Sequence, residues 1–299
     1  MALAPRLVLV HRRTEYQELV ARHGTAGQAG FFLASRGRSL EEAEQRHHQT
    51  LAALAEVAAA VPLDWRRTRV ERGDLARFLF APDDIVAVVG QDGLVANVAK
   101  YLDGQPVIGL DTDPGRNPGV LVRHSSGDAA ELLRAAADPA GGGRVEERTM
   151  VEAVADDSQR LLALNEIYLG QPGHQTARYR LAVDGQPAEP QASSGVLVGT
   201  GTGATGWCRS AWLERRSELA LPAPDASALA WFVREAWPSQ ATGTAQVQGL
   251  LTQDSRLTVT VGSDRLVAFG DGMEADALEL FWGQTVRVGV AATRLRLLV

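Results

Sequence analysis

The sequence contains a single cysteine and a single lysine, and each scarcity excludes a class of site. With Cys208 alone, the chain can form neither an internal disulfide nor a multi-cysteine zinc site. Lys100 is the one lysine among 30 basic residues, and the string G-x-x-x-x-G-K-[S/T] does not occur, which excludes a Walker-type phosphate loop. A phosphate site in this chain therefore has to use backbone amides, arginine or a metal ion.

The composition also lacks the features of proteins that bind nucleic acid or membranes. The net charge of −6 disfavours both kinds of anionic partner. The longest mostly apolar stretch, residues 51–63, is interrupted by Glu56 and is too short to span a bilayer. The 299 residues and the hydrophobic fraction of 45% allow one large domain or two ordinary ones, each with a sizeable core. We therefore expect a cytoplasmic protein with no nucleic-acid or membrane partner.

The first half of the sequence alternates between strand and helix patterns. Continuous apolar runs are typical of parallel strands that are covered on both faces. Ser39-Leu40-Glu41-Glu42 has the pattern of a capping box at a helix start, and Asp74 can cap a shorter helix. We expect strands at Arg6–Val10, Trp65–Val70, Ile85–Val89 and Pro106–Leu110, and helices at 39–60, 75–80, from 94 onward and at 129–137.

The second half changes to the strict alternation of antiparallel strands. Tyr179, Leu181 and Val183 alternate with polar residues before the turn Asp184-Gly185, which predicts a hairpin. The expected fold class is α/β plus β: an N-terminal parallel α/β domain over residues 1–125, and a C-terminal β-rich domain over 126–282. Residues 283–299 are expected to pack back on the first domain. Ligands commonly bind between two such domains.

Two loops with aspartates follow expected parallel strands, and ligands bind beyond the carboxyl ends of such strands. One is Gly90-Gln91-Asp92-Gly93, and the other runs over residues 111–119 with Asp111 and Asp113. Asp92 can accept a proton from a hydroxyl, bind that hydroxyl or hold Mg²⁺. The alternative is that glycine and aspartate are ordinary turn residues here.

A glycine- and threonine-rich loop over residues 199–207 follows the expected strand Val196–Val198 and precedes a helix through Trp212. Its Gly201-x-Gly203-x-x-Gly206 spacing matches the dinucleotide fingerprint, but the antiparallel surroundings argue against a Rossmann unit. Exposed amides and hydroxyls at a helix start suit an adenine, a ribose or a phosphate. A purely structural turn fits these features about as well.

Asn165 and Glu166 interrupt the apolar run LLALNEIYLG. At least one of two adjacent strand residues points toward a covered surface and needs partners there. The pair is therefore either a ribose-hydroxyl clamp or the end of a strand. His47 and His48 diverge around a helix and cannot share one metal ion, and Cys208 is expected to be a small core residue.

Taken in order, these segments resemble the NAD kinase family, and most of all its mitochondrial type. The resemblance is carried by VVGQDGLVANVAKYL, PVIGLDTDPGRNPGVLV, ALNEIYLG, SSGVLVGTGTGATGWCRSAW and the late FGDGM around Asp271. It implies transfer of the γ-phosphoryl group of ATP to the adenosine ribose 2′-hydroxyl of NAD, with Mg²⁺. It also implies a homodimer or a higher homo-oligomer.

The resemblance further implies roles for individual residues. Asp92 is expected to act as the general base or to orient the hydroxyl. The residues expected to bind the nucleotides are Gly90, Gln91, Gly93, Asn165, Glu166, Thr202, Gly203, Thr205 and Trp207.

Two positions depart from the family pattern: Gln91 replaces a glycine, and Leu94 replaces a threonine. If Gln91 has a positive φ, a side chain there is strained by roughly 1 kcal/mol or more. Two alternatives therefore remain beside the kinase. One is a protein that binds NAD(P) or another adenine nucleotide without catalysis, and the other is a related kinase that acts on another sugar or alcohol.

Overall fold

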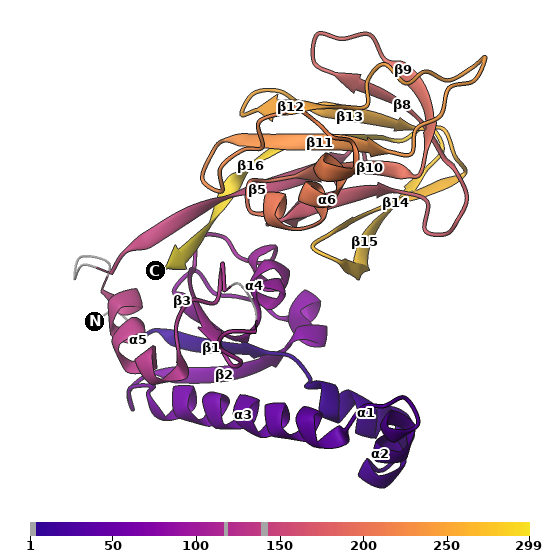
Figure 1. Ribbon diagram of the computed structural model, residues 1–299. Coiled ribbons are helices and arrows are strands. Elements are labelled where there is room, and N and C mark those ends of the chain that lie inside the picture. Colours follow the sequence, from indigo (N-terminus) through magenta and orange to yellow (C-terminus); the bar gives the residue numbers. More distant parts are fainter. Residues whose placement is uncertain (1–3, 117–118, 139–142) are drawn as a thin grey trace. The chain divides into compact units, whose positions relative to one another are not determined.

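The computed structural model describes residues 4–116, 119–138 and 143–299. The chain divides into two compact units, each of which is described by itself. The first unit comprises residues 1–98, 105–146 and 296–299, and the second comprises residues 99–104 and 147–295. Figure 1 shows both units with their helices and strands.

The first unit is built on a parallel sheet with the strand order β2-β1-β3-β4. Arg296 and Leu297 add the end of a fifth strand, which pairs in parallel with β4. The strands are β1 (Arg6–His11), β2 (Arg66–Glu71), β3 (Asp84–Gly90), β4 (Pro106–Asp111) and the end of β16 (Thr285–Leu298).

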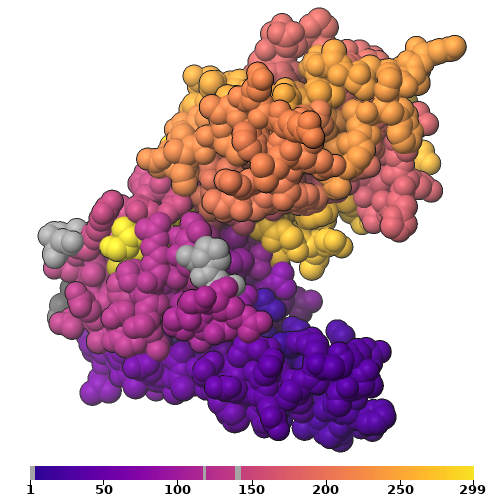
Figure 2. Space-filling view, viewed as in Figure 1, coloured from indigo at the N-terminus to yellow at the C-terminus, as the bar shows by residue number. Residues whose placement is uncertain are grey.

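Helices connect these strands and cover the sheet. Leu54 and Val57 on α3 and Leu133 on α5 pack with Ile85 and Leu110 of the strands in one apolar cluster. This packing explains why β1, β3 and β4 consist largely of buried apolar residues, whereas the edge strand β2 is mostly polar. In the space-filling view, residues drawn in indigo and purple gather on one side of this unit (Figure 2). The helices are α1 (Glu15–His23), α2 (Ala26–Ala34), α3 (Leu40–Ala59), α4 (Asp92–Ala99) and α5 (Ala129–Ala137), with 3₁₀ turns η1 (Arg72–Arg77) and η2 (Ser126–Asp128).

The second unit contains antiparallel strands that enclose a core of alternating apolar side chains. One set runs β16-β13-β8-β9, with β5 and β6 beside it, and the other is a six-stranded sheet in the order β12-β11-β10-β7-β14-β15. Leu181, Val259, Val196 and Leu266 belong to the apolar cluster that both sets share. The strands are β5 (Val145–Ala155), β6 (Arg160–Ala163), β7 (Glu166–Gly170), β8 (Ala177–Val183), β9 (Glu189–Ser193), β10 (Gly195–Gly199), β11 (Ala228–Arg234), β12 (Gln248–Thr252), β13 (Leu257–Val261), β14 (Arg265–Gly270) and β15 (Met273–Phe281).

A single short α-helix, α6 (Trp207–Glu214), packs on the other face of the six-stranded sheet within the described part of this unit. Cys208 is fully buried there against Leu197 and Phe232. The 3₁₀ turn η3 (Gly203–Thr205) leads into α6 directly from the glycine- and threonine-rich loop. The loop is therefore held at both ends, by β10 within the sheet before it and by α6, which packs on the sheet, after it.

The expected fold class is confirmed, as parallel α/β followed by antiparallel β. The first unit extends to Glu146, whereas the sequence placed the domain boundary near residue 125, and that domain assignment stays a prediction. Residues 139–142, which follow the expected helix at 129–137, lie outside the described residues. No helix in the described chain is long and apolar enough to cross a membrane.

Two helix starts differ from expectation. Ser39 does cap α3, but its hydroxyl accepts a hydrogen bond from the amide of Glu41 at 3.1 Å and not from that of Glu42, so the capping box is wrong. The expected helix at 75–80 is the 3₁₀ turn η1, and Glu71, not Asp74, caps it. The carboxylate of Glu71 reaches the free amide of Gly73 at 3.0 Å, which leaves nothing for Asp74 to cap.

Gly109 on β4 is required by a close backbone approach, which gives a first prediction. A Cβ atom at this position would lie 2.0 Å from the carbonyl oxygen of Leu121 and 2.9 Å from the Cα of Val122. Neither atom can rotate away, so Gly109→Ala should lower the free energy of unfolding by about 2–3 kcal/mol. Gly27→Ala on α2 is the control, because a Cβ there meets nothing within 4 Å. Urea unfolding measures both, and equal stability of the two variants would contradict the packing at Gly109.

Candidate functional site

The GQDG turn lies where the expected fold placed it, at the carboxyl end of the central strand β3. Gly90 is the last residue of β3, α4 begins at Asp92, and Gly90 is in register with Asp111 of the neighbouring strand. A cavity of about 280 Å³ opens at this edge of the first unit. It is lined by Arg12, Arg13, Thr14, Glu15, Glu18, Ala43, Arg46, Thr50, Val89, Gly90, Gln91, Thr112, Asp113 and Arg116.

Asp92 binds backbone amides within its own unit. Its Oδ2 accepts a hydrogen bond from Val120 N at 3.0 Å, and its Oδ1 accepts from Leu121 N at 2.8 Å and Val122 N at 3.0 Å. A carboxylate offers about four acceptor positions, so roughly one remains for a ligand. This geometry suits a group that orients a hydroxyl better than one that removes its proton unaided.

The two departures from the family pattern have different surroundings. Gln91 is exposed on the wall of the cavity and is not among the described residues with a positive φ, so the strain expected there is absent. Leu94 is buried, with 3% of its surface exposed, and it packs inside the unit. Gln91 therefore faces a ligand space, and Leu94 does not.

In the second unit, a buried carboxylate fixes the Asn165-Glu166 segment. Asp271 accepts hydrogen bonds from Leu164 N at 2.8 Å, Asn165 N at 2.7 Å and Glu166 N at 3.4 Å. The amide of Asp271 in turn donates to the carbonyl of Glu166 at 3.1 Å. Asp271 has φ +53, a conformation uncommon outside glycine, which the surrounding hydrogen bonds hold in place. Asn165 lies in a bend between β6 and β7, and Glu166 begins β7.

The glycine- and threonine-rich loop packs directly on this segment. The Thr200 amide donates to Asn165 O at 2.9 Å, and its hydroxyl donates to Leu164 O at 2.6 Å. The same hydroxyl accepts from the amides of Thr202 and Gly203. A Cβ at Gly203 would lie 2.2 Å from Asn165 O, so glycine is required for this contact. The structure thus brings Asn165, Glu166, Thr202 and Gly203 together.

Two polar groups at this junction have no partner in the described structure. Thr202 is 2% exposed, and its hydroxyl is buried without a hydrogen bond. Glu166 is partly buried, and burial together with the nearby Asp271 raises the pKa of its carboxyl to about 8. Burial likewise raises the pKa of Asp271 to about 6, although its three amide partners and Lys100 act in the opposite direction. Unsatisfied buried groups of this kind are typical of binding sites.

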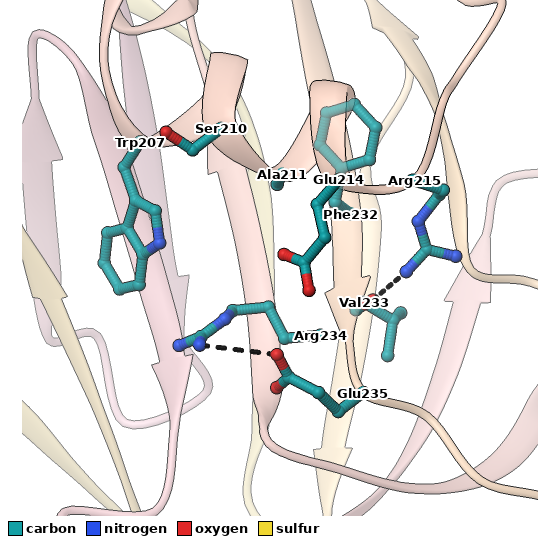
Figure 3. A pocket seen from close by; sticks show the side chains of 9 residues that line it. All are labelled: Trp207, Ser210, Ala211, Glu214, Arg215, Phe232, Val233, Arg234 and Glu235. Carbon is teal, nitrogen blue, oxygen red and sulfur yellow. Dashed lines mark hydrogen bonds and ion pairs between the residues drawn. The ribbon is translucent and has the colours of Figure 1, made fainter.

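Trp207 and Thr205 lie at the other end of the loop. The Thr205 hydroxyl donates to Thr202 O at 2.9 Å and is thereby occupied. The Trp207 ring stacks on Tyr168 at a centroid distance of 5.5 Å, and the guanidinium of Arg234 lies 5.2 Å from its centroid. Figure 3 shows Trp207 and Arg234 on the wall of a cavity of about 270 Å³ between α6 and β11.

Several other sequence candidates have structural roles. Asp111 accepts a hydrogen bond from Asp113 N, and Asp113 forms an ion pair with Arg116. Burial raises the pKa of Cys208 to about 12, which removes it as a nucleophile. His47 contacts the Thr14 hydroxyl and stacks on Tyr16. Among the described residues, no group of three or more His, Cys, Asp or Glu side chains could hold a metal ion.

Asp271 is the residue whose role sequence reasoning missed. The Asp271-Gly272 pair gave a signal, because an aspartate before glycine at a strand end is common in turns with positive φ. What the pattern could not show is which backbone the carboxylate would bind, since its three partners lie more than 100 residues earlier in the chain.

Curated proteins similar to the chain include NAD kinases from bacteria and a mammal. The Clostridium tetani NAD kinase is 31% identical over 135 residues, which cover 43% of this chain and 47% of that protein. The Methylococcus capsulatus NAD kinase is 35% identical over 136 residues, which cover 43% of the chain and 45% of the relative. The chain is related to the NAD kinases. Its resemblance to that family is thereby confirmed.

The similarity to the mitochondrial NAD kinase 2 of Rattus norvegicus is lower but longer. It amounts to 25% identity over 255 residues, which cover 68% of this chain and 59% of that protein. The matched stretches thus span about half the length of these relatives. No protein-family profile matches the chain.

The raised pKa of Glu166 gives a second prediction. The unfolded glutamate loses its proton near pH 4.5, whereas the folded carboxyl keeps it to about pH 8. Between these values the folded state binds more protons, so this group's contribution to stability falls as pH rises. Glu166→Gln should therefore raise the melting temperature at pH 8 and reduce the loss of stability between pH 5 and 8.

The control is Glu274→Gln, which removes an exposed carboxylate from β15 of the same unit. Melting temperatures measured by calorimetry from pH 5 to 9 compare the two variants with the parent chain. A Glu166→Gln profile parallel to that of the parent would show that Glu166 titrates normally.

Proposed function

We propose that the protein transfers the γ-phosphoryl group of ATP to the adenosine ribose 2′-hydroxyl of NAD. The proposal is supported by its similarity to proteins named NAD kinases. The observation that carries the proposal is the buried, unpartnered hydroxyl of Thr202 beside Asn165 and Glu166. A closed loop that leaves one hydroxyl unsatisfied is explained by a ligand that hydrogen-bonds to it.

The second unit supplies the acceptor side of the proposed reaction. Asn165 and Glu166 have no side-chain partner in the described structure, and their backbone is fixed by Asp271. A glutamate that keeps its proton near neutral pH can both donate to and accept from a ribose hydroxyl. Thr202 and Gly203 lie against the same segment, and Trp207 offers an aromatic face at the end of the loop for the adenine side.

Asp92 is proposed to orient the attacking 2′-hydroxyl. Three amides hold its carboxylate in one position, so a hydroxyl that binds to it would be held in a defined orientation. In the transfer, the bond between this oxygen and the γ-phosphorus forms while the β–γ bridging bond breaks, and ADP leaves. The hydroxyl proton passes to Asp92 or to solvent. Positioning of this kind accounts for most of the catalysis in phosphoryl transfer.

The described residues form no cluster of metal ligands, so in this proposal Mg²⁺ would be bound by the donor's phosphates and by water. Such an ion would neutralise charge on the transferred group. The homo-oligomer and the cytoplasmic location stay predictions.

One observation favours a second candidate, a protein that binds NAD or another adenine nucleotide without catalysis. The amides of residues 120–122 already occupy most of the acceptor positions of Asp92. In that case nucleotides bind the second unit normally, and NADP is not formed from NAD or NADH with ATP and Mg²⁺.

The buried hydroxyl provides a direct test of the acceptor site. Thr202→Val replaces that hydroxyl with a methyl group of similar size, so the free chain should gain about 1 kcal/mol of stability while NAD binds roughly tenfold more weakly. Thr200→Val is the matched control and should lose stability, because its hydroxyl makes three hydrogen bonds. Calorimetric titration with NAD and urea unfolding give both quantities. Unchanged NAD affinity in Thr202→Val would remove this hydroxyl from the site.

The role of Asp92 is tested by Asp92→Asn, which keeps the size of the side chain and removes its charge. We expect kcat for NADP formation to fall by about 10²–10⁴-fold with little change in NAD affinity. Asp128→Asn controls for lost backbone hydrogen bonds, because Asp128 accepts from the Ser125 amide and hydroxyl in the same unit. A fall in kcat no larger than that of Asp128→Asn would contradict a role in the reaction.

A further inference from the structure

We infer that Lys100, the one lysine of the chain, is a positioning residue that fixes the Asn165-Glu166 segment by acting through Asp271. Lys100, Asp271 and that segment all belong to the second unit. Only the expected effect on NAD affinity rests on the proposed function.

The Lys100 ammonium is buried and is held in place by one carboxylate. Its Nζ atom lies 2.9 Å from Oδ1 and 2.7 Å from Oδ2 of Asp276 on β15. The hydroxyl of Tyr101 donates to the same Oδ2 at 2.5 Å, so two consecutive residues bind this carboxylate. Because 2% of the Lys100 side chain is exposed, solvent does little to screen the charge. The ammonium therefore has a fixed position and acts strongly on its surroundings.

The hairpin that carries Asp276 also carries Asp271, in the turn that joins β14 to β15. Burial raises the pKa of the Asp271 carboxyl to about 6, and the Lys100 ammonium acts against this rise. A proton on Asp271 would turn one acceptor oxygen into a hydroxyl that faces amide donors, which would cost hydrogen bonds to residues 164–166. The charge of Lys100 thus favours the form of Asp271 that binds three amides.

Stability alone is a poor explanation for a buried lysine at this position. Desolvation of two buried charges offsets much of their attraction, and replacing such a pair with apolar residues is often neutral or stabilising. Every other residue among the 30 lysines and arginines is an arginine. A guanidinium is broad and planar, whereas an ammonium is a compact point charge. The single lysine therefore indicates that a compact positive charge is needed beside Asp271.

The other titratable groups near Asp271 change their charge well away from pH 6. Burial, together with the charge of Asp271, raises the pKa of the Glu166 carboxyl on β7 to about 8. Burial raises the pKa of the Cys208 thiol on α6 to about 12. Asp276 is already bound by Lys100 and by the Tyr101 hydroxyl. A protonation step near pH 6 in this region therefore belongs to Asp271.

The main test follows the three amides by NMR and needs no ligand. It uses the full chain with Glu166→Gln, which removes the neighbouring titration, and the shifts of amides 164–166 should change with a midpoint at about pH 6. Adding Lys100→Met should raise this midpoint by roughly one pH unit, because a positive charge that favours the ionised form is lost. Lys100→Arg keeps the charge and should leave the midpoint close to that of the parent.

The control is Arg180→Met, which removes an exposed positive charge from β8 of the same unit and should leave the midpoint unchanged. The inference is overturned if Lys100→Met leaves the midpoint unchanged, or if Arg180→Met or Lys100→Arg raises it as far. Melting curves show which variants fold. If Lys100→Met does not fold, Lys100→Met/Asp276→Asn removes the ammonium without leaving an unpaired carboxylate and should show the same rise.

NAD affinity of the chain with Glu166 intact separates this inference from the proposed function. Calorimetric titration should show NAD binding to Lys100→Met that is about fivefold weaker than in the parent near pH 6 and nearly equal near pH 8.5, because the ionised fraction of Asp271 differs only at the lower pH. Equal weakening at both pH values would indicate a merely structural role and would contradict the inference.

The two readouts fail independently. If the NMR midpoint shifts but NAD does not bind, the positioning role of Lys100 stands and the proposed function fails. If NAD is bound and phosphorylated but the midpoint does not shift, the proposed function stands and Lys100 has no positioning role.

Discussion

The candidate acceptor site depends on one interaction, the binding of three consecutive backbone amides by the carboxylate of Asp271. Because these amides belong to residues 164–166, the carboxylate fixes the point where β6 ends and β7 begins. The Thr200 hydroxyl and amide then attach the glycine- and threonine-rich loop to the carbonyls of Leu164 and Asn165. The polar side chains near that loop are thereby held on a rigid backbone, which is the condition for precise ligand placement.

The rigid segment around Asp271 also contains buried polar groups that lack hydrogen-bond partners or are close to another carboxyl group. The three amides donate hydrogen bonds to Asp271, but burial still raises the pKa of its carboxyl to about 6. The pKa of the adjacent Glu166 carboxyl is raised further, to about 8. Two carboxyl groups close together in a poorly solvated place cannot both ionise cheaply. These two carboxyl groups and the unpaired Thr202 hydroxyl each cost folding free energy, so their presence is not explained by a contribution to stability. Such regions are where function, rather than folding, has determined the residues.

The sequence was sufficient for the features that repeat along the chain and insufficient for those that join distant segments. The apolar run Ile85–Val89 and the alternation at residues 179–183 predicted β3 and β8, because strand periodicity is local. The GQDG turn could be placed at a strand end for the same reason. In contrast, the partners of Asp92 lie about 30 residues away, and those of Asp271 more than 100. Residue spacing does not reveal which of several amides a carboxylate will bind. The sequence therefore left Asp92 as either a turn residue or a ligand-binding group, and it assigned Asp271 no role.

Gln91 and Leu94 differ from the family pattern, and the sequence alone did not show what surrounds either side chain. A glycine and a threonine in this turn would bring backbone and a hydroxyl to a phosphate, and here Gln91 lines the cavity while Leu94 is buried in the unit. Arginines that follow β1 and β4, together with Arg46 on α3, line the same cavity, so its positive charge comes from elements outside the turn. The chain therefore keeps the aspartate of the turn, held by the amides of residues 120–122, while Gln91 changes the wall of the adjacent cavity.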